Sequence, residues 1–426
     1  MVAKHILRNG LRVVSESIPH VRSVALGIWI HTGSENETEG NNGISHFLEH
    51  MLFKGTEKRN ARQLAEAFDE IGGQVNAFTS KELTCFYAKV LDQHFSIALD
   101  ILTDMFLHSQ LLAEEVEREK KVITEEIRMV EDTPDDQIHD LLAKASYGSH
   151  SLAYPILGSV ENVNRFSRDD LMFYQQQFYQ PKRVVVAVAG NLADDYLEQI
   201  EQAFQSFKEP DLSPLHAASR PIFTPSVYHK KKEIEQTHIC LGLPGLALDD
   251  ARIYHMILLN NILGGNMSSR LFQLIREEKG LAYSVFSFHS AHRQTGLFTL
   301  YAGTAHGQED EVIQCIYQIF EQLVAKGFSS SELWKAKEQL KANLMMGLES
   351  THNRMSRLGR NEILLNRHLE LDEVVQMVEE ISLEELNQLA KEVVTAPASL
   401  AIVSPSGKVP KSFRRDSIDT SFDHSI

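Results

Sequence analysis

Phe166-Ser-Arg-Asp-Asp-Leu-Met-Phe-Tyr174, followed by Val184-Val-Val-Ala-Val-Ala189, is a helix-then-strand pattern that this chain contains twice. The second copy is Ile381-Ser-Leu-Glu-Glu-Leu-Asn-Gln-Leu389, followed by Ser399-Leu-Ala-Ile-Val403. A single offset of 215 residues superposes both the helix starts and the strand starts. Self-similarity at a fixed offset indicates an internal duplication, and here it divides the chain nearly in half.

Other features of the two halves support this duplication. Ser167 and Ser382 each precede an acidic residue by three positions, which predicts a capping box at each helix start. Upstream, both halves show an apolar strand, a helix, a hairpin region and two long charged helices, in that order. The strands are expected at Val24–His31 and at His238–Leu243. A chance likeness between two unrelated α/β domains is the alternative at this level of detail.

The domain boundaries follow from composition. Four prolines and no sustained periodicity between Lys208 and Tyr228 indicate an interdomain linker. We therefore expect domains at 1–208 and 229–410, joined by a linker at 209–228, with a surface tail at 411–426. Each domain is expected to be of the α/β (α+β) class.

Composition excludes several classes of protein. The chain has 426 residues, with 43% hydrophobic and 23% charged residues, as globular proteins do. Its net charge of −16 and its lack of a basic stripe argue against binding to nucleic acid. The longest apolar run, 184–189, is far shorter than the ~18–20 residues of a membrane-spanning helix. Three widely spaced cysteines without a CxxC pair, and an amino terminus without a signal pattern, favour the cytoplasm.

The segment Gly43-Ile-Ser-His-Phe-Leu-Glu-His-Met-Leu-Phe-Lys-Gly55 carries the most specific chemistry. Its apolar residues recur with the spacing of one buried helical face. His46 and His50 are one turn apart and can reach a single zinc ion, and Glu49 lies beside them, where a carboxylate can take a proton from water. This is the inverted zinc-protease motif, the inverzincin pattern. Two histidines packed beside a core helix are the alternative.

A hydrolytic zinc site needs a third protein ligand. The charged helix expected at 113–130 offers several acids, and Glu119 and Glu126 are two turns apart on a face that borders the apolar stripe. Spacing alone does not choose between Glu125 and Glu126, and a run this acidic is usually a solvated surface.

The chain closely resembles the insulinase/pitrilysin family, especially its mitochondrial-processing-peptidase-like branch of bacterial-type processing proteases. The resemblance rests on the 43–55 segment and on Gln74-Val-Asn-Ala-Phe-Thr-Ser-Lys-Glu-Leu-Thr-Cys-Phe-Tyr87, and it extends over nearly the whole chain. It implies one zinc ion per chain, with Glu126 matching the family's third ligand and Glu119 its supporting acid. In the second half the corresponding helix, at 254–263, lacks the motif, so that domain is expected to be metal-free.

The resemblance also implies residues outside the zinc site. Arg276 and Tyr283 match an Arg and a Tyr that complete the family's active site, where they can bind a substrate carbonyl and stabilise an oxyanion. On residue chemistry alone, they would be an exposed helix charge and a strand residue. Family architecture implies mostly antiparallel sheets packed with helices, one half-shell of a clamshell chamber per chain, and a homodimer in which this pair faces the partner's zinc.

The alternating segment 73–80 predicts a strand near a sheet edge, which offers backbone groups to an extended peptide. By resemblance, substrate lies along Asn76, Ala77 and Phe78; an ordinary hairpin strand is the alternative. The family's presequence-recognising subunit carries a long glycine-rich loop, whereas this chain has only Gly264-Gly265-Asn266, so recognition of that kind is not expected.

Together these observations predict a zinc metalloendopeptidase or oligopeptidase that hydrolyses short or unfolded peptides, with Glu49 as general base. The alternatives are a non-catalytic subunit of the same fold and a partner-dependent subunit in a heterodimer.

Overall fold

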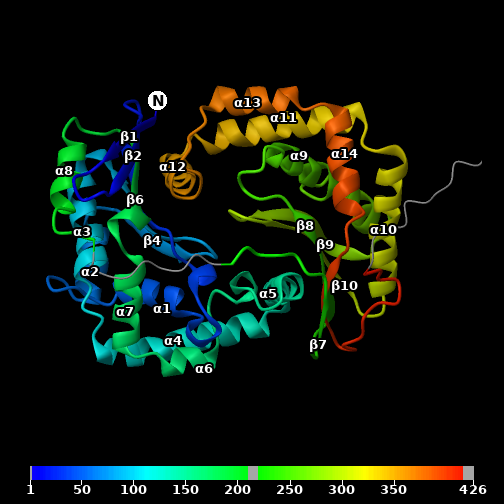
Figure 1. The fold of residues 1–426 in the computed structure, drawn as a ribbon, viewed down its shortest axis with the longest axis horizontal. Helices are drawn as coiled ribbons and strands as arrows, with labels where there is room; N and C mark the ends of the chain where they lie inside the picture. Colours follow the sequence, from blue (N-terminus) through cyan, green and yellow to red (C-terminus); the bar gives the residue numbers. More distant parts are fainter. Residues whose placement is uncertain (1, 210–218, 416–426) are drawn as a thin grey trace, which may run out of the picture. The chain divides into compact units, whose positions relative to one another are not determined.

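The computed structural model describes residues 2–209 and 219–415. Its chain forms two compact units, which Figure 1 shows with their elements labelled. Within the described residues, unit 1 consists of 2–129, 154–209 and 345–370, and unit 2 of 130–153, 219–344 and 371–415.

Unit 1 is built on a six-stranded sheet in the order β1-β2-β6-β3-β5-β4. Neighbouring strands are antiparallel except β2 and β6, which run parallel. The strands are β1 Val2–Ile6, β2 Arg12–Ser17, β3 Ser23–Ile30, β4 Gln74–Thr79, β5 Thr84–Leu91 and β6 Val184–Gly190. β6 is buried along its whole length, as expected for a continuous apolar run covered on both faces.

Most helices of this first half of the chain pack around that sheet. The helices of this half are α1 Ile44–Leu52, α2 Ala61–Glu70, α3 Phe95–His108, α4 Ala113–Asp132, α5 Pro134–Tyr147, α6 Val160–Arg165, α7 Arg168–Phe178 and α8 Tyr196–Ala203, with short 3₁₀ turns η1 Ser34–Asn36, η2 Glu39–Asn41, η3 Asp92–His94, η4 Ser151–Ala153 and η5 Pro181–Arg183. Of these, α5 and η4 belong to unit 2. One hydrophobic cluster joins α1, α3 and α7 to the strands.

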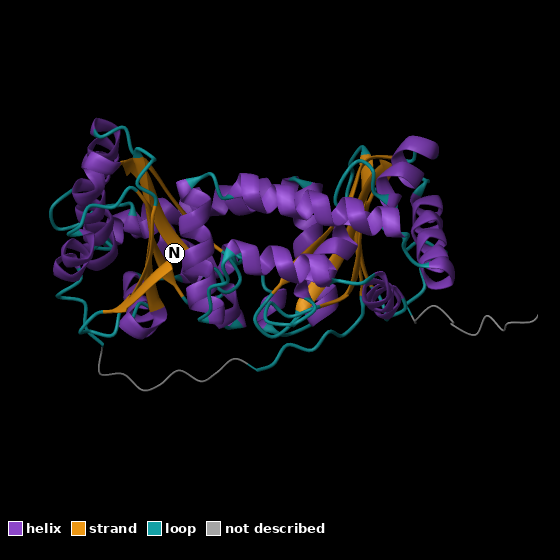
Figure 2. Ribbon diagram, turned by 90° about the horizontal axis from the view of Figure 1, so that it is seen from above, coloured by secondary structure: helices purple, strands orange, loops and turns teal. Residues whose placement is uncertain are grey.

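Unit 2 has a five-stranded sheet in the order β7-β11-β8-β10-β9. Its strands are β7 Val227–Lys231, β8 Gln236–Gly245, β9 Ala282–Ala291, β10 Gly296–Ala305 and β11 Ser399–Ser404. The helices of the second half are α9 Ile253–Leu263, the π-helix η6 Phe272–Glu278, α10 Glu309–Lys326, α11 Ser330–Gly347, α12 Thr351–Leu365, α13 Leu371–Glu380 and α14 Leu383–Val394. Figure 2 shows helices on either side of each sheet.

The sheet topologies confirm the internal duplication. With β1 left aside, the order β2-β6-β3-β5-β4 in unit 1 repeats as β7-β11-β8-β10-β9 in unit 2, including one parallel pair at the equivalent place. Both capping boxes form as predicted, at Ser167 with Asp170 and at Ser382 with Glu385. Two α/β halves with largely antiparallel sheets are therefore present.

The compact units differ from the expected domains because each contains a helix from the other half of the sequence. α12 packs on β2, β3 and β6 of unit 1, and α5 packs on β8 and β11 of unit 2. Gly359 permits the first contact, because a Cβ there would overlap the Trp29 indole. An apolar strand pattern shows that a sheet needs cover on both faces, but not which helix provides it.

The linker and tail boundaries also differ from expectation. Residues 210–218 of the expected linker lie outside the described residues, and its end is already strand, since β7 begins at Val227. Residues 416–426 of the expected tail lie outside them too. The start of the tail packs against α10, where Asp310 Oδ1 accepts from Ser412 N at 2.8 Å and Tyr317 OH accepts from Arg414 N at 3.0 Å.

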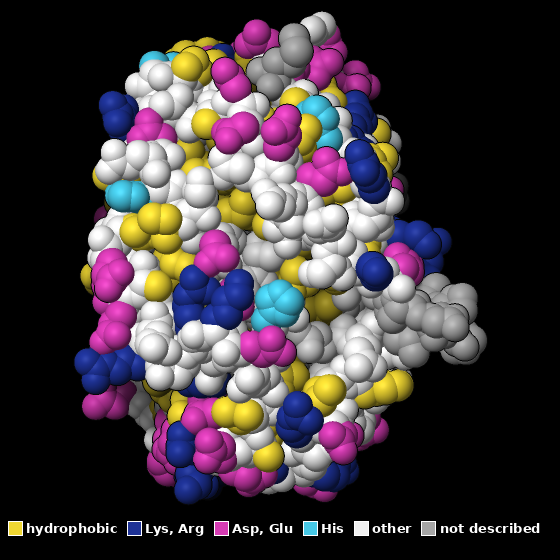
Figure 3. All heavy atoms as spheres, turned by 90° about the vertical axis from the view of Figure 1, so that its left-hand side faces the viewer, with side chains coloured by type: hydrophobic (Ala, Val, Ile, Leu, Met, Phe, Trp, Pro, Cys, Tyr) yellow, Lys and Arg dark blue, Asp and Glu magenta, His cyan; other side chains and the backbone are white. Residues whose placement is uncertain are grey.

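Acidic and basic side chains are interspersed on the face drawn in Figure 3, so this face has no large patch of one charge. Among the described residues, no helix is both long enough and apolar enough to cross a membrane.

A buried carboxylate anchors α12 within unit 1. Glu362 has no exposed side-chain surface and binds Lys4 Nζ at 2.8 Å, Arg12 Nη1 at 2.9 Å and His368 Nε2 at 3.0 Å. Burial alone would raise the pKa of Glu362, but hydrogen bonds from His368 and Lys4, with the charges of Lys4 and Arg12, outweigh it and lower the pKa to about 2. The carboxylate therefore stabilises the fold in its ionised form.

We expect Glu362→Gln to lower the free energy of unfolding by about 3 kcal/mol near pH 7, because it leaves buried cationic partners uncompensated. Because the folded-state pKa is depressed, this contribution is complete above the unfolded pKa of ~4.3 and is lost as pH falls toward 2. Urea denaturation at pH 7 and pH 3 measures the difference. The exposed Glu198→Gln serves as control; equal losses in both variants would contradict this role for Glu362.

Candidate metal centre

Helix α1 carries the motif, and its burial explains its position. The apolar residues Ile44, Phe47, Leu48, Met51 and Leu52 are all buried in the core of unit 1. Because a helix repeats every 3.6 residues, the same winding turns His46, Glu49 and His50 to another side. The hydrophobic face thus fixes the orientation of the polar one.

The start of α1 is held by a residue that sequence reasoning missed. Buried Glu37 accepts hydrogen bonds from Gly43 N at 2.8 Å and Ser45 N at 2.9 Å, which satisfies amides that the helix leaves unpaired. Gly43 has φ 100°, and a Cβ there would lie 2.7 Å from Leu157 O, so only glycine fits. Glu37 lies seven residues upstream of α1, outside the local capping patterns, which is why no sequence signal identified it.

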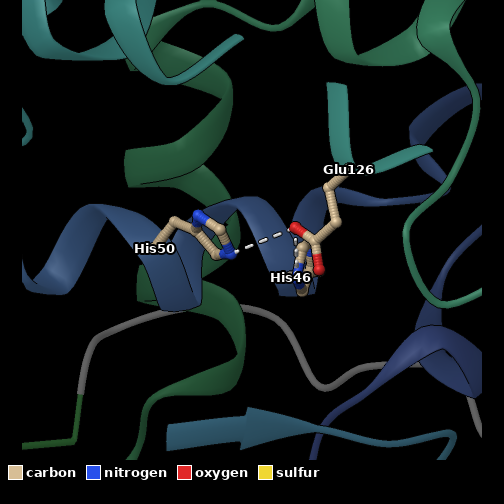
Figure 4. Close-up of side chains that lie close together, drawn as sticks. All are labelled: His46, His50 and Glu126. Atoms are coloured by element: carbon tan, nitrogen blue, oxygen red, sulfur yellow. Dashed lines mark ion pairs between the residues drawn. The ribbon is translucent and has the colours of Figure 1, made fainter. Parts of the chain in front are cut away.

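Three side chains from two helices converge in Figure 4: His46 and His50 from α1, and Glu126 from α4. Glu126 Oε2 lies 3.7 Å from His46 Nε2 and 3.6 Å from His50 Nε2. One candidate ligand atom from each residue lies within 4.8 Å of the other two. Two ligands of one tetrahedral zinc are about 3.4 Å apart, so this donor set fits that metal.

The electrostatics of His46 also suit a metal ligand. Burial, and next the charge of His50, lower the pKa of His46 to about 3, so its imidazole is neutral at pH 7. Metal binding requires a neutral imidazole. Its Nδ1 is buried and has no hydrogen-bond partner among the described residues, while Nε2 faces Glu126.

Glu119 and Lys54 orient His50. Glu119 Oε1 lies 2.8 Å from His50 Nδ1, and Glu119 Oε2 lies 2.8 Å from Lys54 Nζ. Burial acts to raise the pKa of Glu119, but hydrogen bonds from His50 and Lys54 outweigh it and lower the pKa. The anionic carboxylate thus holds the proton on Nδ1 and leaves Nε2 free for a metal. Lys54 was missed by sequence reasoning, since it lies beyond the motif.

Glu49 lies beside this set on α1. Its side chain is buried, and Oε2 accepts a hydrogen bond from Thr79 Oγ1 at 2.5 Å. Burial raises the pKa of Glu49, and the hydrogen bond from Thr79 opposes that rise. A carboxylate with a raised pKa, next to a metal-binding set, is suited to accept and return a proton near neutral pH.

The neighbouring strand β4 lies at an edge of the sheet, as the sequence predicted. Ala77 N donates to Asn76 Oδ1 at 2.8 Å, so this amide points away from β5. Phe78 is 37% exposed and makes edge contacts with Trp29, with ring centroids 5.6 Å apart. The outer edge of β4 therefore carries backbone groups that no strand of this sheet pairs.

Comparisons with known proteins agree with this geometry. Residues 12–160 match the model for insulinase (peptidase family M16), and residues 165–340 match the model for the peptidase M16 inactive domain. The chain belongs to this peptidase family. It is 50% identical over 410 residues to the Bacillus subtilis zinc protease YmxG, covering 96% of this chain and 100% of that protein.

A more distant relative and a solved structure are also similar to this chain. The Streptomyces coelicolor zinc protease SCO5738 is 39% identical over 411 residues, covering 95% of this chain and 90% of that protein. The crystal structure of a protease from Helicobacter pylori has a TM-score of 0.88 at 23% identity, covering 95% of this chain and 99% of that one. This last likeness shows the shared fold.

The structure distinguishes Glu125 from Glu126 on α4, the two candidate metal ligands between which sequence spacing could not choose. Glu125 is exposed and pairs with Arg128 Nη1 at 2.5 Å, whereas Glu126 turns toward the histidines. Val116, Ile123 and Ile127 are buried and define the core side of the helix, as expected.

Arg276 and Tyr283, which the M16 resemblance singled out, come together within unit 2. The Arg276 guanidinium lies 4.5 Å from the centroid of the Tyr283 ring and 4.7 Å from that of Phe272. Tyr283 is 77% exposed on the edge strand β9, the counterpart of β4. Arg276 lies in a π-helix, which sequence reasoning did not predict; such turns occur often at functional sites.

The Lys54–Glu119–His50 chain predicts a measurable effect on metal affinity. In Lys54→Met the pKa of Glu119 should rise, which weakens the hydrogen bond that orients His50. We expect zinc affinity to fall about tenfold or more, as for other partners of metal-bound histidines. Competition with a chromophoric chelator on metal-free protein measures it. Lys58→Met, at an exposed position, is the control, and unchanged affinity in Lys54→Met would refute the effect.

Proposed function

We propose that this protein is a zinc-dependent endopeptidase or oligopeptidase that hydrolyses short or unfolded peptides. The observation that carries the proposal is the convergence of His46, His50 and Glu126 beside the buried carboxylate of Glu49. Membership of a peptidase family, and relatives named as zinc proteases, support the same activity.

In the proposed mechanism, His46, His50 and Glu126 hold one zinc ion per chain, and Glu119 supports His50. Bound zinc supplies Lewis-acid chemistry that polarises a carbonyl and lowers the pKa of water. Glu49 takes the proton from the attacking water and later gives it to the leaving amine, so that it acts first as general base and then as general acid.

Substrate binding is assigned to two edge strands. The peptide pairs with β4 through the outward-facing backbone of Ala77, with the side chains of Asn76 and Phe78 flanking it, and this mode needs little sequence specificity. Arg276 and Tyr283 bind the substrate carbonyl and stabilise the developing oxyanion. The contacts of the Arg276 guanidinium with the Phe272 and Tyr283 rings support this role, because they hold the cation beside the Tyr283 phenol.

We further propose a homodimer in which Arg276 and Tyr283 of one subunit complete the zinc site of the other. Two such chains would form the halves of a clamshell chamber. A cytoplasmic location is consistent with Cys85, Cys240 and Cys315, all free and buried. A non-catalytic role for the same fold is the alternative, but nothing in the zinc-ligand set favours it.

Glu49→Gln tests the mechanism directly. We expect hydrolysis of a quenched peptide library to fall about 10²- to 10⁴-fold, the usual contribution of a general base. Zinc measured in the same sample should remain near one ion per chain, and a chelator should abolish the wild-type activity. Glu125→Gln, an exposed acid on the same helix as Glu126, is the matched control. Full hydrolysis by Glu49→Gln would rule out this mechanism.

A complementation experiment tests the dimer. Co-expressed Glu49→Gln and Arg276→Gln chains, purified through two different tags, would form dimers with one intact site and one doubly altered site. By the symmetry of the interface, we expect about half of the wild-type activity, against very little for either variant alone. Sedimentation should show a dimer; a fully active monomer would contradict the proposal.

A further inference from the structure

Glu49, the proposed base, is held by a single hydrogen bond among the described residues. That bond comes from the hydroxyl of Thr79 on strand β4, at 2.5 Å from Glu49 Oε2. It is charge-assisted whenever Glu49 is ionised, and such bonds are short and roughly twice as strong as neutral ones. The position of this carboxylate thus depends on one residue of the neighbouring strand.

The pleat of β4 directs the Thr79 side chain toward α1. Val75 and Ala77 pack against the hydrophobic cluster that contains the apolar face of α1, while Asn76 and Phe78 are exposed. Side chains of a strand alternate between its two faces, so Thr79 shares the face of Val75 and Ala77. The hydroxyl of Thr79 therefore points toward α1 and reaches the Glu49 carboxylate.

The backbone of Thr79 lies on the open edge of the sheet. Ala77 N points away from β5, as its bond to Asn76 Oδ1 shows, and backbone groups of an antiparallel strand alternate in direction. Thr79, two residues further on, therefore directs its own N–H and C=O outward, while Ser80 N turns back to Leu83 O at 2.7 Å. One residue thus presents its backbone to the edge and its hydroxyl to Glu49.

We propose that Thr79 is a positioning residue that couples peptide docking to placement of the base. Its hydroxyl fixes Glu49 Oε2 and leaves Oε1 to face the attacking water, and a peptide that pairs with β4 steadies the strand that carries this hydroxyl. The inference rests on the proposed peptidase function and adds a role for a residue that touches neither metal nor reacting bond.

Thr79→Val tests the role of the hydroxyl, because valine has nearly the same shape and the same preference for strands. We expect kcat to fall roughly tenfold to a hundredfold, with KM changed by less than about twofold, since the backbone edge is intact. Thr79→Ser retains the hydroxyl and should keep kcat near wild type. Thr79→Ala, smaller and also lacking the hydroxyl, gives the same test where valine does not fit.

Two readouts are independent of turnover. Zinc affinity, measured by chelator competition, should be unchanged in Thr79→Val. Crystal structures should show the Glu49 carboxylate displaced in Thr79→Val and in place in Thr79→Ser. Thr32→Val is the matched control, because it removes another buried threonine hydroxyl, bonded to Tyr174 OH at 2.7 Å, that does not contact Glu49. It should lose stability and keep its kcat.

The outcomes separate this inference from the proposed function. Wild-type kcat in Thr79→Val, or an equal loss in Thr79→Ser, would overturn the role of Thr79 while chelator-sensitive hydrolysis by the wild type leaves the peptidase assignment standing. A wild-type protein that binds zinc and cleaves no peptide would overturn both.

Discussion

The burial of one face of α1 is the constraint on which the site depends. Five large apolar residues of a nine-residue helix lie in the core of unit 1, and each contributes about 1.5–3 kcal/mol relative to exposure. This sum outweighs the cost of keeping neutral His46 in a buried position, where its pKa is lowered to about 3. Because all three residues lie on this one helix, the backbone of α1 sets the spacing of the histidines and Glu49.

The carboxylates of Glu119 and Glu49 differ in the number of groups that hydrogen-bond to them. Glu119 has two close cationic or donor partners, and its pKa is lowered despite burial. Glu49 has one hydrogen bond, and its pKa is raised. Glu119, which contacts His50, is thus well solvated by protein groups, while Glu49, the proposed base, is poorly solvated. This difference follows from the number of donors that each one meets.

The two units share one strand order, but they differ in the chemical groups that they carry. Both units repeat one strand order, and one edge strand of each sheet carries residues that we propose to bind substrate, β4 in unit 1 and β9 in unit 2. Only the first copy has the histidine motif. The exchange of α5 and α12 between the sequence halves gives each sheet a helix from the other half. On the sheet of unit 1, Gly27 and Gly359 allow the close approach of Met355 and Trp29.

Local periodicity and spacing by themselves determined the duplication, α1 with its two histidines, both capping boxes and the edge position of β4, because these depend on residues near one another in sequence. The choice of Glu126 over Glu125 came from family resemblance, and tertiary structure explains it through the turn of α4. Only tertiary structure decided the contacts of Glu37, Lys54 and Thr79 and the exchange of α5 and α12. Each of these joins segments whose pairing depends on packing and burial, for which a linear sequence carries no local signal.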